Sequence, residues 1–124
     1  MATAIGLTIE EFEQLPDPLA HNHELVNGEL VDVSGNTLSH NSLRDAIGDL
    51  LRAHVRERKL GRVVAEQEYD FDGNAHGPDV SFFGPAKEKF VDSDLRVQRF
   101  VPDLAIEIVS KRDRFDALFE KALR

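Results

Sequence analysis

Hydrophobic positions recur along this chain with the spacing of short helices, one long helix and several strands. Residues 8–15 read TIEEFEQL, in which Thr8 and Glu11 have the spacing of a capping box and Pro16 is expected to end the helix. The next segment, HELVNGELVDV, holds two apolar-rich runs around Asn27-Gly28, a pair typical of a type I′ hairpin turn. A two-residue turn predicts three pairs across this hairpin: Val26 with Glu29, Leu25 with Leu30, and Glu24 with Val31.

A long amphipathic helix is predicted from about Asn41 to Leu60, with Gly61 as its stop. Six residues repeat at helical spacing and predict the buried stripe: Leu43, Ile47, Leu50, Leu51, His54 and Val55. Three arginines, Arg44, Arg52 and Arg56, lie off this stripe in the predicted helix. On this reading His54 is a core histidine.

Three further segments read as strands. Residues 62–71 (RVVAEQEYDF) predict one strand, 72–77 (DGNAHG) a turn, and 78–83 (PDVSFF) a second strand. Residues 84–100 are charged and irregular, which predicts a loop. Residues 102–109 (PDLAIEIV) are nearly all apolar, as in a strand covered on both faces.

A last helix is predicted after Ser110, with an apolar stripe of Phe115, Leu118, Phe119 and Ala122. The order of elements predicts one α/β or α+β domain over residues 1–124, with a mixed central sheet flanked by helices and an N-terminal hairpin.

Composition restricts the classes of function. The chain of 124 residues has no Cys, which excludes disulfides and thiolate metal sites and suits a reducing cytoplasm. It has no signal-like leader and no long apolar run, so no membrane association is expected. A net charge of −8 argues against a broad basic surface for nucleic acid, although residues 43–62 are locally basic.

Glu107 is the first candidate for chemistry, because it is the only ionisable side chain between Leu104 and Val109. Burying a carboxylate is costly unless it is paired or bound to a metal. Two readings stay open for this residue alone: a metal or general-base site, or a salt bridge at the end of a sheet. Asp79 starts another predicted strand, and two carboxylates from neighbouring strands would suit Mg²⁺.

The ordered set HELVNGELVDVS, SHNSLRDAIGDLLRAHVRERKLGRVVAE, GPDVSFF and PDLAIEIVS, followed by a helix containing Lys121, resembles the Uma-type family. That family is classed with the restriction endonucleases of the PD-(D/E)XK nuclease superfamily. The resemblance runs from about Thr8 to the end of the chain. It implies a restriction-endonuclease-like fold and a metal-dependent endonuclease that hydrolyses phosphodiester bonds in DNA.

The resemblance also implies roles for particular residues. Asp79 and Glu107 would hold Mg²⁺ or Mn²⁺, with Glu24 completing the acidic cluster. The catalytic lysine would be Lys121, on the helix that follows the strand, with Lys111 as a weaker candidate. His40 matches the histidine before the family's long helix, where it would accept a proton or donate to a phosphate; a surface position at the helix start is the simpler alternative.

The remaining candidates divide between function and ordinary structure. Arg44, Arg52 and Arg56 are expected to contact the DNA backbone. Glu66 and Glu68 share a face of the predicted strand and are either extra ligands or exposed residues, while His76 has no matching partner at metal-ligand spacing.

A non-catalytic module with a nuclease-like fold is the alternative function. Family members normally continue with further strands, so we expect a C-terminally short domain. Either the chain is a shortened form, or its fold is completed by self-association as a homodimer or larger assembly.

Overall fold

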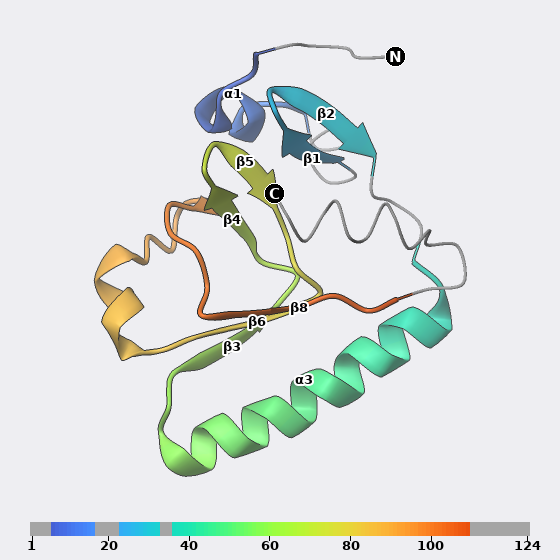
Figure 1. The fold of residues 1–124 in the computed structure, drawn as a ribbon, viewed down its shortest axis with the longest axis vertical. Helices are drawn as coiled ribbons and strands as arrows, with labels where there is room; N and C mark the ends of the chain where they lie inside the picture. Colours follow the sequence, from blue (N-terminus) through green and yellow to red (C-terminus); the bar gives the residue numbers. More distant parts are fainter. Residues whose placement is uncertain (1–5, 17–22, 33–35, 110–124) are drawn as a thin grey trace.

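The computed structural model describes residues 6–16, 23–32 and 36–109, and it has the mixed α+β fold that the sequence predicts (Figure 1). The elements, in chain order, are α1 (Ile9–Glu13), β1 (His23–Val26), β2 (Glu29–Asp32), α3 (Leu38–Arg58), β3 (Arg62–Ala65), β4 (Glu68–Phe71), β5 (Asn74–His76), β6 (Val80–Phe83), the 3₁₀ helix η1 (Pro85–Phe90), β7 (Val97–Gln98) and β8 (Leu104–Ile106). The helix predicted after Ser110 lies outside the described residues. Within the described part of the chain, no helix combines the length and apolar content needed to cross a membrane.

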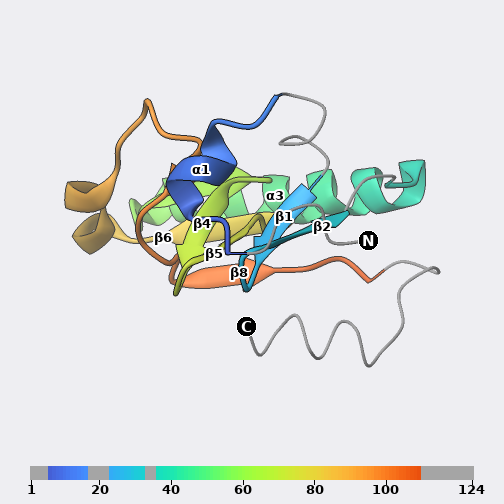
Figure 2. The ribbon, with the colours of Figure 1, turned by 90° about the horizontal axis from the view of Figure 1, so that it is seen from above.

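The strands form two sheets where the sequence predicted one central sheet. One sheet has the order β2-β1-β5-β4-β7 and the other β3-β6-β8. Helix α3 contacts β3 and β6 of the smaller sheet, whereas α1 lies beside the hairpin and the larger sheet (Figures 1 and 2). The two helices therefore cover different parts of the molecule.

The N-terminal elements confirm the local predictions. Thr8 caps α1, and the reciprocal bonds between Thr8 and Glu11 complete the capping box. The hairpin has the predicted register, with Glu24 opposite Val31. Asn27 and Gly28 have φ of 51° and 79°, the positive values that a type I′ turn requires.

Helix α3 begins and ends earlier than predicted. Thr37 is the N-cap, because its hydroxyl accepts a hydrogen bond from the His40 N–H, and the helix ends at a left-handed Lys59 with φ of 53°. The predicted limits of Asn41 and Leu60 are therefore wrong by about one turn at the start and by less at the end.

The buried face of α3 also differs from the predicted stripe. His40, Gly48 and Val55 are buried, whereas Leu50 is 75% exposed and His54 is exposed. Leu43 is likewise exposed at 49%, so three members of the predicted stripe point away from the sheet. Polar contacts explain the rotation, because His40 and Arg44 face the sheet ends to pair with Asp79 and Glu66.

The predicted strand over residues 62–71 is two strands, because the ribbon breaks in its middle. β3 pairs antiparallel with β6 and β4 with β5, so the four strands form two ladders in different sheets. At the break Glu66 has a positive φ of 57°, and its N–H donates to the Asp79 carbonyl. On the opposite side Pro78 has no N–H to give to a ladder. The segment predicted as a turn contains β5, and only Asp72-Gly73 forms the turn.

The segment 84–100 is more ordered than the predicted loop. It contains η1 and β7, and β7 pairs parallel with β4. Val97 is buried with Phe12 and Leu25 in one hydrophobic cluster, and Phe100 packs with Tyr69 in a second. Buried apolar residues spaced among charged ones give no regular period, which is why the pattern did not reveal them.

β8 pairs with β6 at the edge of the smaller sheet, as far as the structure describes the chain. Leu104 is 44% exposed and Ala105 is exposed, so the prediction of a strand covered on both faces is wrong. An apolar run cannot by itself distinguish an edge strand from a central one.

Candidate active site

Asp79 stands at the break in the ribbon, directly before β6, and its side chain is largely buried. Its Oδ2 accepts a hydrogen bond of 2.7 Å from the Ile108 N–H, and its Oδ1 lies 3.2 Å from His40 Nε2. The two bonds fix the carboxylate between the start of α3 and the end of β8.

Glu107 follows the last residue of β8, next to the Ile108 N–H that binds Asp79. The chain therefore brings Asp79 and Glu107 to one place, as expected from the sequence. Glu107 Oε1 is shielded from solvent and lies 3.7 Å from His76 Nε2.

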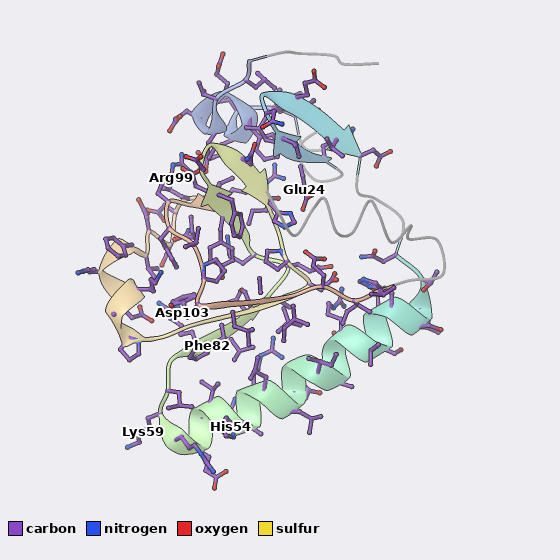
Figure 3. All side chains as sticks on the ribbon, in the orientation of Figure 1. Glu24, His54, Lys59, Phe82, Arg99 and Asp103 are labelled. Carbon is purple, nitrogen blue, oxygen red and sulfur yellow. The ribbon has the colours of Figure 1, made fainter. Side chains whose placement is uncertain are left out.

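Glu24 is a buried carboxylate in β1, with 4% of the residue exposed. Its Oε2 accepts from the Gly77 N–H at 3.0 Å and lies 2.8 Å from His76 Nδ1. Figure 3 shows Glu24 between the hairpin and β5. The alternative that Glu24 is an ordinary exposed hairpin residue is wrong, because β1 is covered by β5 on its second edge.

His76 was missed as a site residue in the sequence. It lies between Glu24 and Glu107, with one ring nitrogen facing each carboxylate. The contact depends on the pairing of Leu25 with Ala75, which joins strands distant in the chain. A search for metal-ligand spacing cannot find such a partner, although the position of His76 shortly before Asp79 was a weak signal.

His40 is the third residue of α3, and its side chain is 6% exposed. Its Nε2 faces Asp79, and its Nδ1 is buried with no hydrogen-bond partner among the described residues. The positive end of the helix dipole favours the negative charge of Asp79. The surface alternative for His40 is therefore wrong.

Glu66 and Glu68 do not share a face, because the ribbon breaks beside Glu66. Glu66 is exposed and accepts from Arg44 at 2.7 Å, while Glu68 in β4 pairs with Arg96. Burial raises the pKa of Glu68, the hydrogen bond from Arg96 lowers it in part, and the charge of Glu24 adds to the rise.

The three arginines of α3 differ in how available they are. Arg44 is 16% exposed and is paired with Glu66 and Asp45, so its predicted place off the buried face is wrong. Arg52 pairs with Asp49 one turn away, and Arg56 is exposed. Contacts of these residues with DNA stay a prediction.

The described residues fit a divalent cation in the chemistry of their donors. Mg²⁺ is usually held by one or two carboxylates and retained waters, which Asp79 and Glu107 can supply. As they stand, the described ranges contain no group of three or more His, Asp or Glu side chains placed to hold a metal ion. Water would therefore complete the coordination. Lys121 and Lys111 lie outside the described residues.

Asp103, in the Pro-Asp pair that precedes β8, has a different task. Its Oδ2 accepts from the Gly84 N–H at 2.7 Å and its Oδ1 lies 3.7 Å from Lys87 Nζ. Figure 3 places it well away from Glu24. Asp103 therefore ties the start of β8 to the segment after β6, and the aspartate that lies next to Glu107 is Asp79 of the earlier Gly-Pro-Asp.

Comparison with known proteins shows the fold and the family of the chain. The fold is similar to that of a protein from Anabaena variabilis ATCC 29413 described as "a putative nuclease belonging to DUF820", with a TM-score of 0.78 and 19% sequence identity. The match covers 94% of this chain and 66% of that protein, so this chain spans just under two thirds of its length. No curated protein gives a significant match. The family model Uma2, described as "Putative restriction endonuclease", matches residues 9–123. The chain therefore belongs to the Uma2 family.

Proposed function

We propose that this protein is a divalent-cation-dependent endonuclease that hydrolyses phosphodiester bonds in DNA. One observation carries the proposal: the bond from the Ile108 N–H to Asp79 holds Asp79 beside Glu107 at the ends of two paired strands. Family membership and the nuclease description of the similar structure support the same reaction.

Asp79 and Glu107 would hold the cation, Mg²⁺ or Mn²⁺, and the Ile108 carbonyl is the nearest backbone oxygen in sequence to serve with them. A bound divalent cation supplies charge neutralisation at the scissile phosphate and lowers the pKa of water. Glu24, which is itself buried, adds a third carboxylate to the same region through His76.

His40 would position Asp79. Its Nε2 contacts Asp79 Oδ1, and its ring sits in the first turn of α3, so the ring is held by the helix. This contact favours a supporting role over direct contact with a phosphate. The role of Lys121, to orient water and offset negative charge, rests on the family resemblance.

DNA would approach over the exposed part of α3, where Arg52 and Arg56 are the more accessible of the three arginines. Binding of basic side chains to phosphates releases counterions from DNA, and the free energy gained from this release becomes smaller as the salt concentration rises. The affinity for DNA should therefore fall with ionic strength.

Cleavage of plasmid DNA in Mg²⁺ or Mn²⁺ tests the proposal. Asp79→Asn and Glu107→Gln should each lower the rate by about 100-fold or more, since a cation contributes several kcal/mol at the transition state. Asp103→Asn is the matched control, because this carboxylate lies elsewhere and Asn keeps an acceptor for Gly84. It should cleave like the wild type.

A folded wild-type protein that cleaves neither DNA nor RNA in either metal would contradict the proposal. The chain would then be a nuclease-like binding or assembly module. Equal loss of activity in Asp103→Asn would show instead that the first two variants act through stability.

A further inference from the structure

We infer that His76 is a further metal ligand of this site, through Nε2, and that Glu24 holds its ring in place. The inference rests on the proposed function, because it concerns the cation that Asp79 and Glu107 would bind. It extends the site to a residue that the sequence did not indicate.

The hydrogen bonds of Glu24 determine which nitrogen of His76 carries hydrogen. Glu24 Oε2 already accepts from the Gly77 N–H, and His76 Nδ1 approaches the same oxygen at 2.8 Å. A carboxylate oxygen accepts and does not donate, so Nδ1 is the donor. In a neutral ring Nε2 then carries a lone pair directed toward Glu107.

The spacing between His76 Nε2 and Glu107 Oε1 is 3.7 Å, too long for a hydrogen bond. Two donor atoms that each bind one small divalent cation at about 2.1 Å lie between about 3 and 4 Å apart for ordinary ligand angles. A proton on Nε2 would make this contact an ion pair, whereas in the neutral ring a metal cation between the two atoms would be bound by both. The pair therefore has the spacing of two ligands.

The environment of the ring keeps it in this orientation. Glu24 is buried, and the Phe71 ring meets the His76 ring edge-on at 5.2 Å. A buried carboxylate that receives the other N–H of an imidazole is the usual support of a histidine that binds a metal. Glu24 thus acts on the cation through His76.

An imidazole ligand changes which cation the site prefers. Nitrogen ligands favour transition metals, whereas Mg²⁺ takes oxygen ligands. We expect Mn²⁺ to bind more tightly than Mg²⁺, and this preference to depend on His76.

Pulsed electron paramagnetic resonance of the full protein loaded with one equivalent of Mn²⁺ tests the inference directly. The wild type should show coupling of the manganese to an imidazole ¹⁴N. The coupling should be lost in His76→Gln and kept in His40→Gln, the variant of the other histidine beside the carboxylates. Calorimetry should show Mn²⁺ affinity falling at least about 10-fold in His76→Gln, with a smaller change for Mg²⁺.

Three results would overturn the inference. Mn²⁺ bound by the wild type without nitrogen coupling would show that His76 only bridges two carboxylates, and the nuclease proposal would stand. Coupling that survives in a folded His76→Gln protein would assign the nitrogen to another histidine, again without touching the nuclease proposal. A wild type that binds no Mn²⁺ at all would contradict both the inference on His76 and the nuclease proposal. The first and third results are obtained with the wild-type protein, so they do not depend on whether the His76→Gln variant folds.

Discussion

Glu68 shows how a single, largely buried carboxylate near the site affects stability. Its side chain is 17% exposed, and its ion pair with Arg96 offsets only part of the effect of burial, so its pKa is raised in the folded protein. A raised pKa means that the folded state binds the proton more tightly than the unfolded state does. Its contribution to stability is therefore present below the ordinary value of 4.5 and is lost as pH rises above it.

The stability of the wild type relative to Glu68→Gln should consequently fall as pH increases from about 4 to 7. Urea unfolding of both proteins at several pH values measures this difference. A relative stability that rises with pH would show that Arg96 outweighs burial.

Some residues of the candidate site can be recognised from their own segment of the sequence, whereas others depend on contacts with distant segments. The sequence singles out Glu107 because a carboxylate in an apolar run is unusual within its own segment, and Asp79 because it starts a second predicted strand that could pair its carboxylate with Glu107. His76 could not be predicted, because its two partners come from strands that are remote in sequence. The buried role of Glu24 was also hidden, since an exposed hairpin and one covered by β5 have the same pattern.

At the level of elements, the predictions made from short sequence signals are confirmed, whereas the buried face predicted for the long helix is wrong. The capping box of α1 and the Asn27-Gly28 turn depend on neighbouring residues, and both are confirmed. The face of α3 depends on its partners: the contacts of His40 with Asp79 and of Arg44 with Glu66 turn that face toward the sheet ends, and Leu50 is exposed. The break in the ribbon likewise follows from Pro78 and from the contact between Glu66 and Asp79.

Helix α1 is joined to β7 by Glu13, which accepts from Arg99 at 2.7 Å and from the Val97 N–H at 2.9 Å. Burial alone would raise the pKa of Glu13, but these hydrogen bonds and the charge of Arg99 outweigh it and lower the pKa. A lowered pKa gives stability that is present above 4.5 and is lost as pH falls through the folded value.

Glu13→Gln should therefore destabilise the protein at pH 7 by about 1.5 to 3 kcal/mol, the net value of a hydrogen bond to a charged group. The difference from the wild type should shrink as pH falls below 4.5. Glu10→Gln is the control, because Glu10 is exposed and pairs with Arg99 only at 3.4 Å. An equal effect from both variants in thermal unfolding would contradict the assignment to Glu13.

On the scale of the whole molecule, charge is distributed so that distant segments attract. Residues 1–43 hold acidic residues and no Lys or Arg, and two of these acids pair with Arg99 in the second half of the chain. The net charge of −8 therefore does not describe the surface near α3, where Arg56 is exposed. Composition predicted this uneven distribution but not which arginines are used internally.

The general fold class could be predicted from the order of the elements, whereas the division into two sheets could not. The division depends on the break beside Asp79, so the same irregularity that separates the sheets also places the candidate catalytic carboxylate. The pattern of apolar positions alone does not show where paired strands bend apart.

The central claim is that Asp79 and Glu107 share one divalent cation. Anomalous diffraction at the manganese edge, from crystals soaked in Mn²⁺, tests it most directly. We predict one strong peak within ligand distance of both carboxylates, lost in Asp79→Asn crystals. A well-ordered structure without a peak there, or with manganese bound only elsewhere, would contradict the claim.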